Sequence, residues 1–207
     1  MDFSREIKGH TLEFFDEDHI YLVDGLILPS VTQLLSLRFG NKFDHVPRGT
    51  LQRAAEKGIH VHNAIEHYCR TGEEEEDLEE LRNFKFLQRQ YGFVVWDNEV
   101  PVILFEDDEP IAAGRLDMVI QMNGEFGGAD IKRTSSLDKE YLAYQLNLYR
   151  IAFRQCYGMD WKFLRGLWLR EDTRKFVTIP INEEAAWDLI HEWRSSHEQN
   201  DIDRPDD

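Results

Sequence analysis

The pair Asn123-Gly124 constrains this chain most, because it stands between two runs of strand-like composition. Asn-Gly favours a two-residue type I′ turn, in which both central residues adopt a positive φ. Such a turn sets the register of the hairpin. Met122 pairs with Glu125, and the same register places Asp117 opposite Asp130. Cross-strand partners lie on one face with Cβ atoms about 4.5–5.5 Å apart. The sequence therefore predicts two carboxylates side by side.

The same hairpin carries a lysine near the two aspartates. Lys132 is two residues from Asp130 and shares its face, while alternate residues form an apolar core face. That core face is Leu116, Met118, Ile120, Ala129 and Ile131. Two opposed carboxylates repel, and a raised pKa or a bound cation relieves the repulsion. Two alternatives stay open: an exposed Asp–Lys salt-bridge cluster, and a β-bulge at Gly127-Gly128 that shifts the register by one.

The order of the remaining elements predicts one mixed α/β domain over residues 1–199, followed by a disordered acidic tail at 200–207. Residues 1–50 form an N-terminal elaboration with a hairpin (Thr11–Phe15, Ile20–Val23) and a helix to about Leu37, because Ser30 and Gln33 have capping-box spacing. The other expected helices are Leu51–Tyr68, Leu78–Tyr91, Leu137–Tyr157 and one from Asn182 to about His197, and Gly58 is expected to interrupt the first of them. The other expected strands are Phe93–Phe105, Ile111–Met122, Glu125–Lys132, Phe163–Leu169 and Lys175–Ile181.

Charge is distributed unevenly along the chain. The formal net charge of −16 argues against a nonspecific nucleic-acid binder. However, the acid is concentrated in residues 73–110 and 183–207, whereas residues 132–175 hold 10 bases and 5 acids. The N-terminus lacks the pattern of a signal peptide, no apolar run approaches 18 residues, and there are two cysteines. We therefore expect a cytoplasmic protein without a membrane segment, in which a small basic cleft lies on an acidic body.

Four motifs in order resemble a known superfamily. Gly114-Arg115-Leu116-Asp117 followed by Asp130-Ile131-Lys132 resembles the signature of the PD-(D/E)xK nucleases. Gln145 and Tyr149 match the Q-x-x-x-Y helix motif of the RecB-like, phage-type exonuclease branch. Gly58 with His62 is similar to its G-x-x-x-H motif. The resemblance implies a restriction-endonuclease-like core, with a central mixed β-sheet flanked by helices, plus the N-terminal hairpin and helical additions.

The resemblance also implies a set of catalytic and metal-binding residues. Asp117 and Asp130 would be catalytic and would ligate the metal, together with the backbone carbonyl of Ile131 and with His62. Lys132 would orient or activate a water molecule. The cofactor would be one or two ions of Mg²⁺ or Mn²⁺, and the imidazole ligand suits Mn²⁺ better.

Further residues are expected to support this site or to contact DNA. Gln145 and Tyr149 share a helix face, and the alternative is an amphipathic helix with a buried tyrosine. Glu66 lies one turn after His62, where the pair could simply stabilise the helix. Glu99 matches a frequent acidic position of the family. Arg150 either contacts phosphate or is solvated.

The function implied is that of a divalent-metal-dependent deoxyribonuclease. It would hydrolyse phosphodiester bonds as an exonuclease on linear or single-stranded DNA, in phage-type recombination or DNA processing. The implied partners are DNA and a phage recombination or single-strand-annealing protein, and the resemblance also allows a homo-oligomer. The alternative from another class is a catalytically silent nucleic-acid-binding or recombination-partner protein on the same fold.

Overall fold

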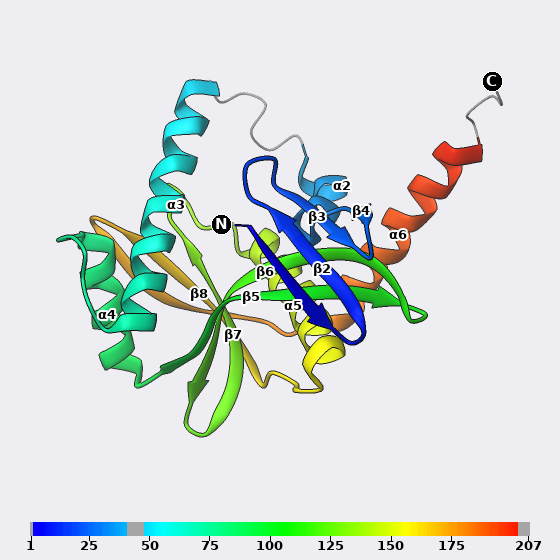
Figure 1. Ribbon diagram of the computed structural model, residues 1–207. Helices are drawn as coiled ribbons and strands as arrows, with labels where there is room; N and C mark the ends of the chain where they lie inside the picture. The colour runs from blue at the N-terminus through cyan, green and yellow to red at the C-terminus, as the bar shows by residue number, and fades with distance from the viewer. Residues whose placement is uncertain (1, 41–47, 203–207) are drawn as a thin grey trace.

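The computed structural model describes residues 2–40 and 48–202 and contains two β-sheets and six helices in that part of the chain (Figure 1). The first sheet is antiparallel and has the order β1-β2-β3-β4; the second has the order β5-β6-β7-β8-β9, with β7 and β8 parallel. The strands are β1 Phe3–Ile7, β2 His10–Phe15, β3 Ile20–Val23, β4 Leu26–Leu28, β5 Val94–Glu106, β6 Glu109–Met122, β7 Glu125–Lys132, β8 Phe163–Arg170 and β9 Thr173–Ile179. The expected mixed α/β class is confirmed. The expected N-terminal hairpin is part of a four-stranded sheet, because β1 and β4 add a strand to each side of it.

Local sequence signals mark the starts of two of the helices. They are α1 Val31–Leu34, α2 Ser36–Phe39, α3 Arg48–Thr71, α4 Glu79–Tyr91, α5 Lys139–Tyr157 and α6 Glu183–Ile202. The Ser30 hydroxyl accepts a hydrogen bond from the Gln33 amide at 3.1 Å, and the Gln33 side chain accepts one from the Ser30 amide at 2.7 Å. This capping box was predicted, although the helix after it is divided into α1 and α2. The Asn182 side chain accepts from the Ala185 amide at 3.2 Å and so caps α6.

Two helix predictions need revision. Gly58 does not interrupt α3, which continues through it. The last helix continues to Ile202, three residues into the segment expected to be disordered, and residues 203–207 lie outside the described residues. No helix in the described residues is both long and apolar enough to cross a membrane.

The hairpin of β6 and β7 has the predicted turn and register. Asn123 and Gly124 have φ angles of 54° and 82°, and the pairs run from Met122↔Glu125 to Met118↔Ala129 without a bulge. The bulge alternative is therefore wrong. The glycines serve packing instead, since a Cβ on Gly128 would lie 2.2 Å from the Trp161 ring.

The β6–β7 pairing stops earlier than predicted. Met118↔Ala129 is the last pair, so Asp117 and Asp130 do not face each other within a continuous ladder. Beyond this point β7 continues alongside β8, and Asp130 pairs with Gly166. The two strands thus separate at the residues that carry the predicted site.

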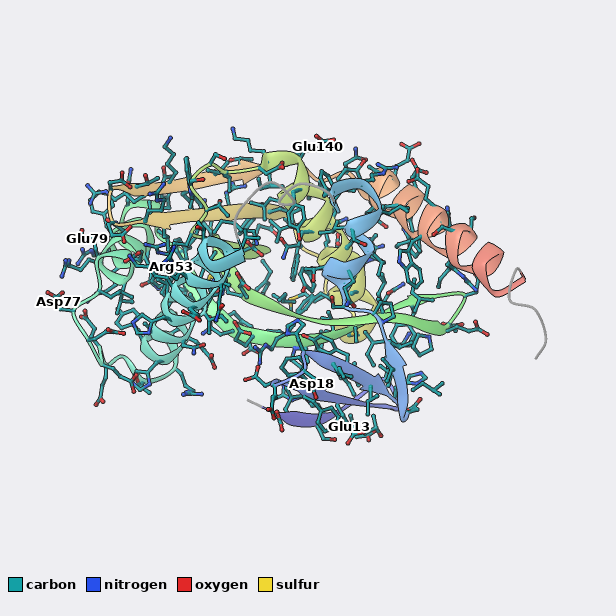
Figure 2. All side chains as sticks on the ribbon, turned by 90° about the horizontal axis from the view of Figure 1, so that it is seen from above. Glu13, Asp18, Arg53, Asp77, Glu79 and Glu140 are labelled. Carbon is teal, nitrogen blue, oxygen red and sulfur yellow. The ribbon has the colours of Figure 1, made fainter. Side chains whose placement is uncertain are left out.

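The five-stranded sheet is covered on both faces, as Figures 1 and 2 show from two directions. Helices α1, α5 and α6 pack on one face, and α3 and α4 pack on the other around Met118, Ile120, Ala129 and Ile131. The N-terminal sheet packs against β5 and β6 through Phe14, Ile103 and Phe105. Four of the five predicted core-face residues share one cluster. Leu116 instead packs with the α5 cluster, and Val119 is buried there too, so the hairpin has no solvent-exposed polar face.

Candidate metal centre

Asp117 lies where β6 separates from β7, and its carboxylate accepts a hydrogen bond from the neighbouring strand in place of a backbone carbonyl. Oδ2 accepts a hydrogen bond of 2.6 Å from the backbone amide of Ile131. Oδ1 lies 3.6 Å from Nδ1 of His62. The carboxylate is therefore held in one orientation by a backbone group of the neighbouring strand.

His62 approaches the same point from α3. Its Nε2 lies 3.2 Å from the carbonyl oxygen of Ile131. A carbonyl oxygen only accepts, so Nε2 carries the proton in this bond. In the neutral ring the lone pair is then on Nδ1, which faces Asp117. In this tautomer the Ile131 carbonyl orients the ring, and the free Nδ1 lone pair is the one that could bind a metal.

Glu99 completes a group of three possible ligands. In the described part of the chain, ligand atoms of His62, Glu99 and Asp117 all lie within 4.8 Å of one another. Glu99 is skipped by the β5–β6 ladder, which pairs Asn98 with Met118 and Val100 with Leu116, and it has a φ of 49°. A non-glycine residue in this region is strained, and such strain is concentrated at functional sites.

The electrostatics of Glu99 follow from its surroundings. Burial, and secondarily the charge of Asp117, raises the pKa of its carboxyl group to about 8. The Arg115 guanidinium, 2.5 Å away, acts in the opposite direction. Burial and the charge of Asp117 therefore outweigh the attraction of Arg115 for the Glu99 carboxylate.

Asp130 and Lys132 form a buried ion pair beside this group. Nζ of Lys132 lies 2.5 Å from Oδ2 of Asp130, whose side chain is 3% exposed. Burial raises the pKa of Asp130 to about 6, while Lys132 opposes that shift and Asp117 adds to it. Burial by itself would lower the pKa of Lys132, but the charges of Asp130 and Asp117 raise it above its ordinary value. Asp130 is not among the three clustered ligands, so the geometry favours Glu99 over Asp130 in a set with His62 and Asp117.

A cleft of about 410 Å³ opens onto this cluster. It is lined by His62, Glu99 and Asp117, and by Gln145 and Tyr149 of α5. The Gln145 Oε1 atom is buried and has no hydrogen-bond partner within the described residues. Burial raises the pKa of Tyr149 well above its ordinary value. Both residues of the helix motif therefore line the cleft that opens onto the cluster.

A second cleft of about 820 Å³ adjoins the first, and the two share Glu99 and Arg115 in their lining. Glu66 lines this larger cleft and lies 3.6 Å from Arg70, outside the ligand cluster. Sequence reasoning did not assign a role to Arg115. Its guanidinium, besides pairing with Glu99, lies 5.1 Å from the ring centroid of Phe14. The tertiary packing of the N-terminal sheet determines that contact.

Arg150 does not lie at the site, contrary to one of the two expectations for it. Its side chain is buried and bonds to Asp160 at 2.6 Å, Glu183 at 2.7 Å and the Trp161 carbonyl at 3.1 Å. It is not solvated either. These bonds join α5 to the start of α6, so the role of Arg150 is structural.

No family model and no curated protein matches this chain. Among solved structures, one described as the crystal structure of SSO0001 aligns with a TM-score of 0.41 and 15% identity. The alignment covers 81% of this chain and 75% of that chain.

Proposed function

We propose that this protein is a divalent-metal-dependent deoxyribonuclease with a PD-(D/E)xK-type core, acting as an exonuclease on linear or single-stranded DNA. One observation carries the proposal. His62, Glu99 and Asp117 converge within 4.8 Å at a cleft, immediately beside the buried Asp130–Lys132 pair. Carboxylates, an imidazole and an amine at one point are the groups that metal-assisted phosphodiester hydrolysis requires.

The donor set fits a divalent cation. Two carboxylates and one imidazole nitrogen suit Mn²⁺, and Mg²⁺ accepts the oxygen ligands. The raised pKa values of Glu99 and Asp130 reflect negative charge that is buried without enough compensation. A divalent cation held by His62, Glu99 and Asp117 would supply that compensation. The Ile131 carbonyl already accepts from His62, so it would act first by orienting that ligand.

The bound ion would lower the pKa of a water molecule and offset charge on the phosphate. The protein residues prepare the surrounding site. The Ile131 amide holds Asp117 in place, so the carboxylate does not reorganise when substrate arrives. Lys132 stays protonated because its pKa is raised, and it offers a charged donor to a phosphate oxygen or to water. The buried Gln145 Oε1 adds an acceptor without a partner in the described residues, on a residue that lines the same cleft.

The proposal is tested by measuring the degradation of labelled DNA in the presence of Mg²⁺, Mn²⁺ or a chelator. The substrates are single- and double-stranded DNA, end-labelled where linear, in linear and circular forms. Linear DNA should be degraded from its ends with metal only, whereas circular DNA should persist. Asp117→Asn, Asp130→Asn and Lys132→Met should each abolish degradation. Asparagine is used because it has the shape of aspartate and can still accept a hydrogen bond. Alanine at position 130 would leave the buried Lys132 without a partner. Glu125→Gln, at the exposed hairpin turn, is the matched control that should stay active.

Two outcomes would decide against the proposal. Full activity in the Asp117→Asn protein would show that the clustered residues do not carry the reaction. DNA binding with no cleavage of any substrate, at any metal concentration, would favour the catalytically silent binding protein instead.

A further inference from the structure

The hairpin of β8 and β9 carries three cations that contact aromatic rings. The pairs are Arg165 with Phe163 and Phe176, Arg174 with Phe86, and Lys175 with Trp168. The chain has 40 acidic and 24 basic residues, yet the structure records no ion pair for these three cations within its described residues. Their charge is thus available to an anionic ligand at the edge of the sheet, where β9 is the last strand.

One of these pairs is in register with the proposed catalytic lysine. Trp168 pairs with Lys132 across the parallel β7–β8 ladder, and Lys175 pairs with Trp168 across the β8–β9 ladder. Paired residues lie on the same face, and neighbouring strands are about 4.7–4.9 Å apart. Lys132, Trp168 and Lys175 therefore form a row across three adjacent strands, starting next to Asp130.

The Trp168 ring is held in place and partly exposed. Its indole Nε1 donates a 2.8 Å hydrogen bond to the carbonyl of Thr134, in the loop between β7 and α5. Nζ of Lys175 lies 4.9 Å from the centre of the ring, on an exposed side chain. In Figure 1 the two strands, in yellow-orange to orange, run side by side near α4. An aromatic ring next to an unneutralised ammonium group is a combination typical of single-strand nucleic-acid binding.

We propose that Trp168 and Lys175 form a subsite for single-stranded nucleic acid, one strand beyond Lys132. A base stacks on the indole ring, and the Lys175 ammonium moves from the ring to an adjacent phosphate. This inference rests on the proposed nuclease function. It adds the position of the substrate strand beyond the catalytic residues. Single strands are favoured because only an unpaired base exposes its face for stacking.

Tryptophan fluorescence tests the stacking step directly, with an oligothymidylate and a chelator so that no cleavage occurs. Binding should quench the emission of the wild-type protein. Trp168→Phe should lose most of that quenching, and Trp168→Ala should bind roughly 5- to 100-fold more weakly, the range typical of one lost stack. Trp96→Phe is the matched control, because Trp96 is 61% exposed on β5 and lies outside the row. Unchanged quenching and affinity in the Trp168 variants would overturn the proposal.

Lys175 provides a test that does not depend on the core packing of a tryptophan. Lys175→Gln should reduce the slope of log affinity against log salt by about 0.7, the value for one phosphate contact on a single strand. Lys162→Gln, a 59% exposed lysine before β8, should leave the slope unchanged. An unchanged slope in Lys175→Gln would also overturn the subsite.

These assays separate the subsite from the nuclease proposal. If the protein cleaves DNA with metal, but the Trp168 and Lys175 variants bind single strands like the wild type, only the subsite proposal is wrong. Stacking and salt effects without cleavage would support the subsite and count against the nuclease.

Discussion

The carboxylate of Asp117 accepts a 2.6 Å hydrogen bond from the backbone amide of Ile131, at the point where β6 and β7 stop pairing. The side chain replaces the strand carbonyl that would otherwise satisfy this amide. The same carboxylate faces His62 and Glu99 across the cleft. One side chain thus terminates a ladder and contributes to the candidate metal centre.

This relationship predicts opposite effects for two substitutions of Asp117. Asp117→Ala leaves the Ile131 amide without its acceptor and should lower the free energy of unfolding by about 1–3 kcal/mol. Asp117→Asn keeps an acceptor and removes a charge that repels Glu99 and Asp130, so the metal-free protein should be at least as stable as wild type. Urea unfolding measures both. If Asn were as destabilising as Ala, the hydrogen bond would not be the important contact.

Metal binding should stabilise the folded protein. At a Mn²⁺ concentration about 100 times the dissociation constant, linkage adds about 2.7 kcal/mol, or roughly 5–10 °C in Tm. A chelator should reverse the shift. His62→Ala should lose most of it, whereas His60→Ala should keep it, because His60 is exposed on the same helix and pairs with Glu76. Equal shifts in both variants would rule out the His62 site.

The stability of the metal-free protein should fall as pH rises. The pKa of Glu99 is about 8 in the folded state against an ordinary value of 4.5, so the folded protein binds more protons than the unfolded protein between these values. Asp130, with a pKa of about 6, adds to the fall between about pH 4 and pH 6. The extra stability is present at low pH and is lost as pH rises through these folded-state values.

Glu99→Gln isolates the upper part of this pH dependence. The variant should keep the fall below about pH 6 and flatten the curve between pH 6 and 8, as measured by denaturant unfolding at each pH. Glu125→Gln, at the exposed turn, should follow the wild-type curve. A wild-type stability that is constant from pH 6 to 8 would contradict the shifted pKa of Glu99.

Arg150 should matter for stability and not for DNA contact. Arg150→Ala leaves Asp160 with less compensation and breaks the link between α5 and α6, so it should cost about 3 kcal/mol or more. At a temperature where the variant is folded, its affinity for single-stranded DNA should equal that of wild type. A selective loss of DNA affinity with unchanged stability would instead restore the phosphate-contact role.

Local chemistry made several parts of the structure predictable. The Asn123-Gly124 turn requires positive φ at both positions, and that requirement alone fixes the register of β6 on β7 as far as Met118 and Ala129. The capping signals at Ser30 and Asn182 act within four residues, so they also could be identified without tertiary information. His62, Gln145 and Tyr149 were placed at the site from their motifs, and the cleft contains all three.

The position of Glu99 opposite Asp117 could not be predicted in this way. The turn at Asp107 and Asp108 pairs Glu106 with Glu109, and that register would place Glu99 across from Leu116. An irregularity between Leu104 and Phe105 shifts the ladder by one residue, which aligns Glu99 with Asp117. A one-residue shift in register moves every side chain to the other face of a strand. No local sequence pattern predicts such a shift here.

The sequence by itself determined the elements, the β6–β7 turn and the identity of most candidate residues, because those depend on short-range backbone preferences and side-chain spacing. Only the tertiary structure decided that β6 and β7 separate at Asp117, that Glu99 joins His62 and Asp117, and that Arg150 is buried away from them. These outcomes depend on packing between segments far apart in the chain, including α3, α5 and the N-terminal sheet. The candidate metal centre is therefore assembled from residues that the sequence names separately and long-range packing brings together.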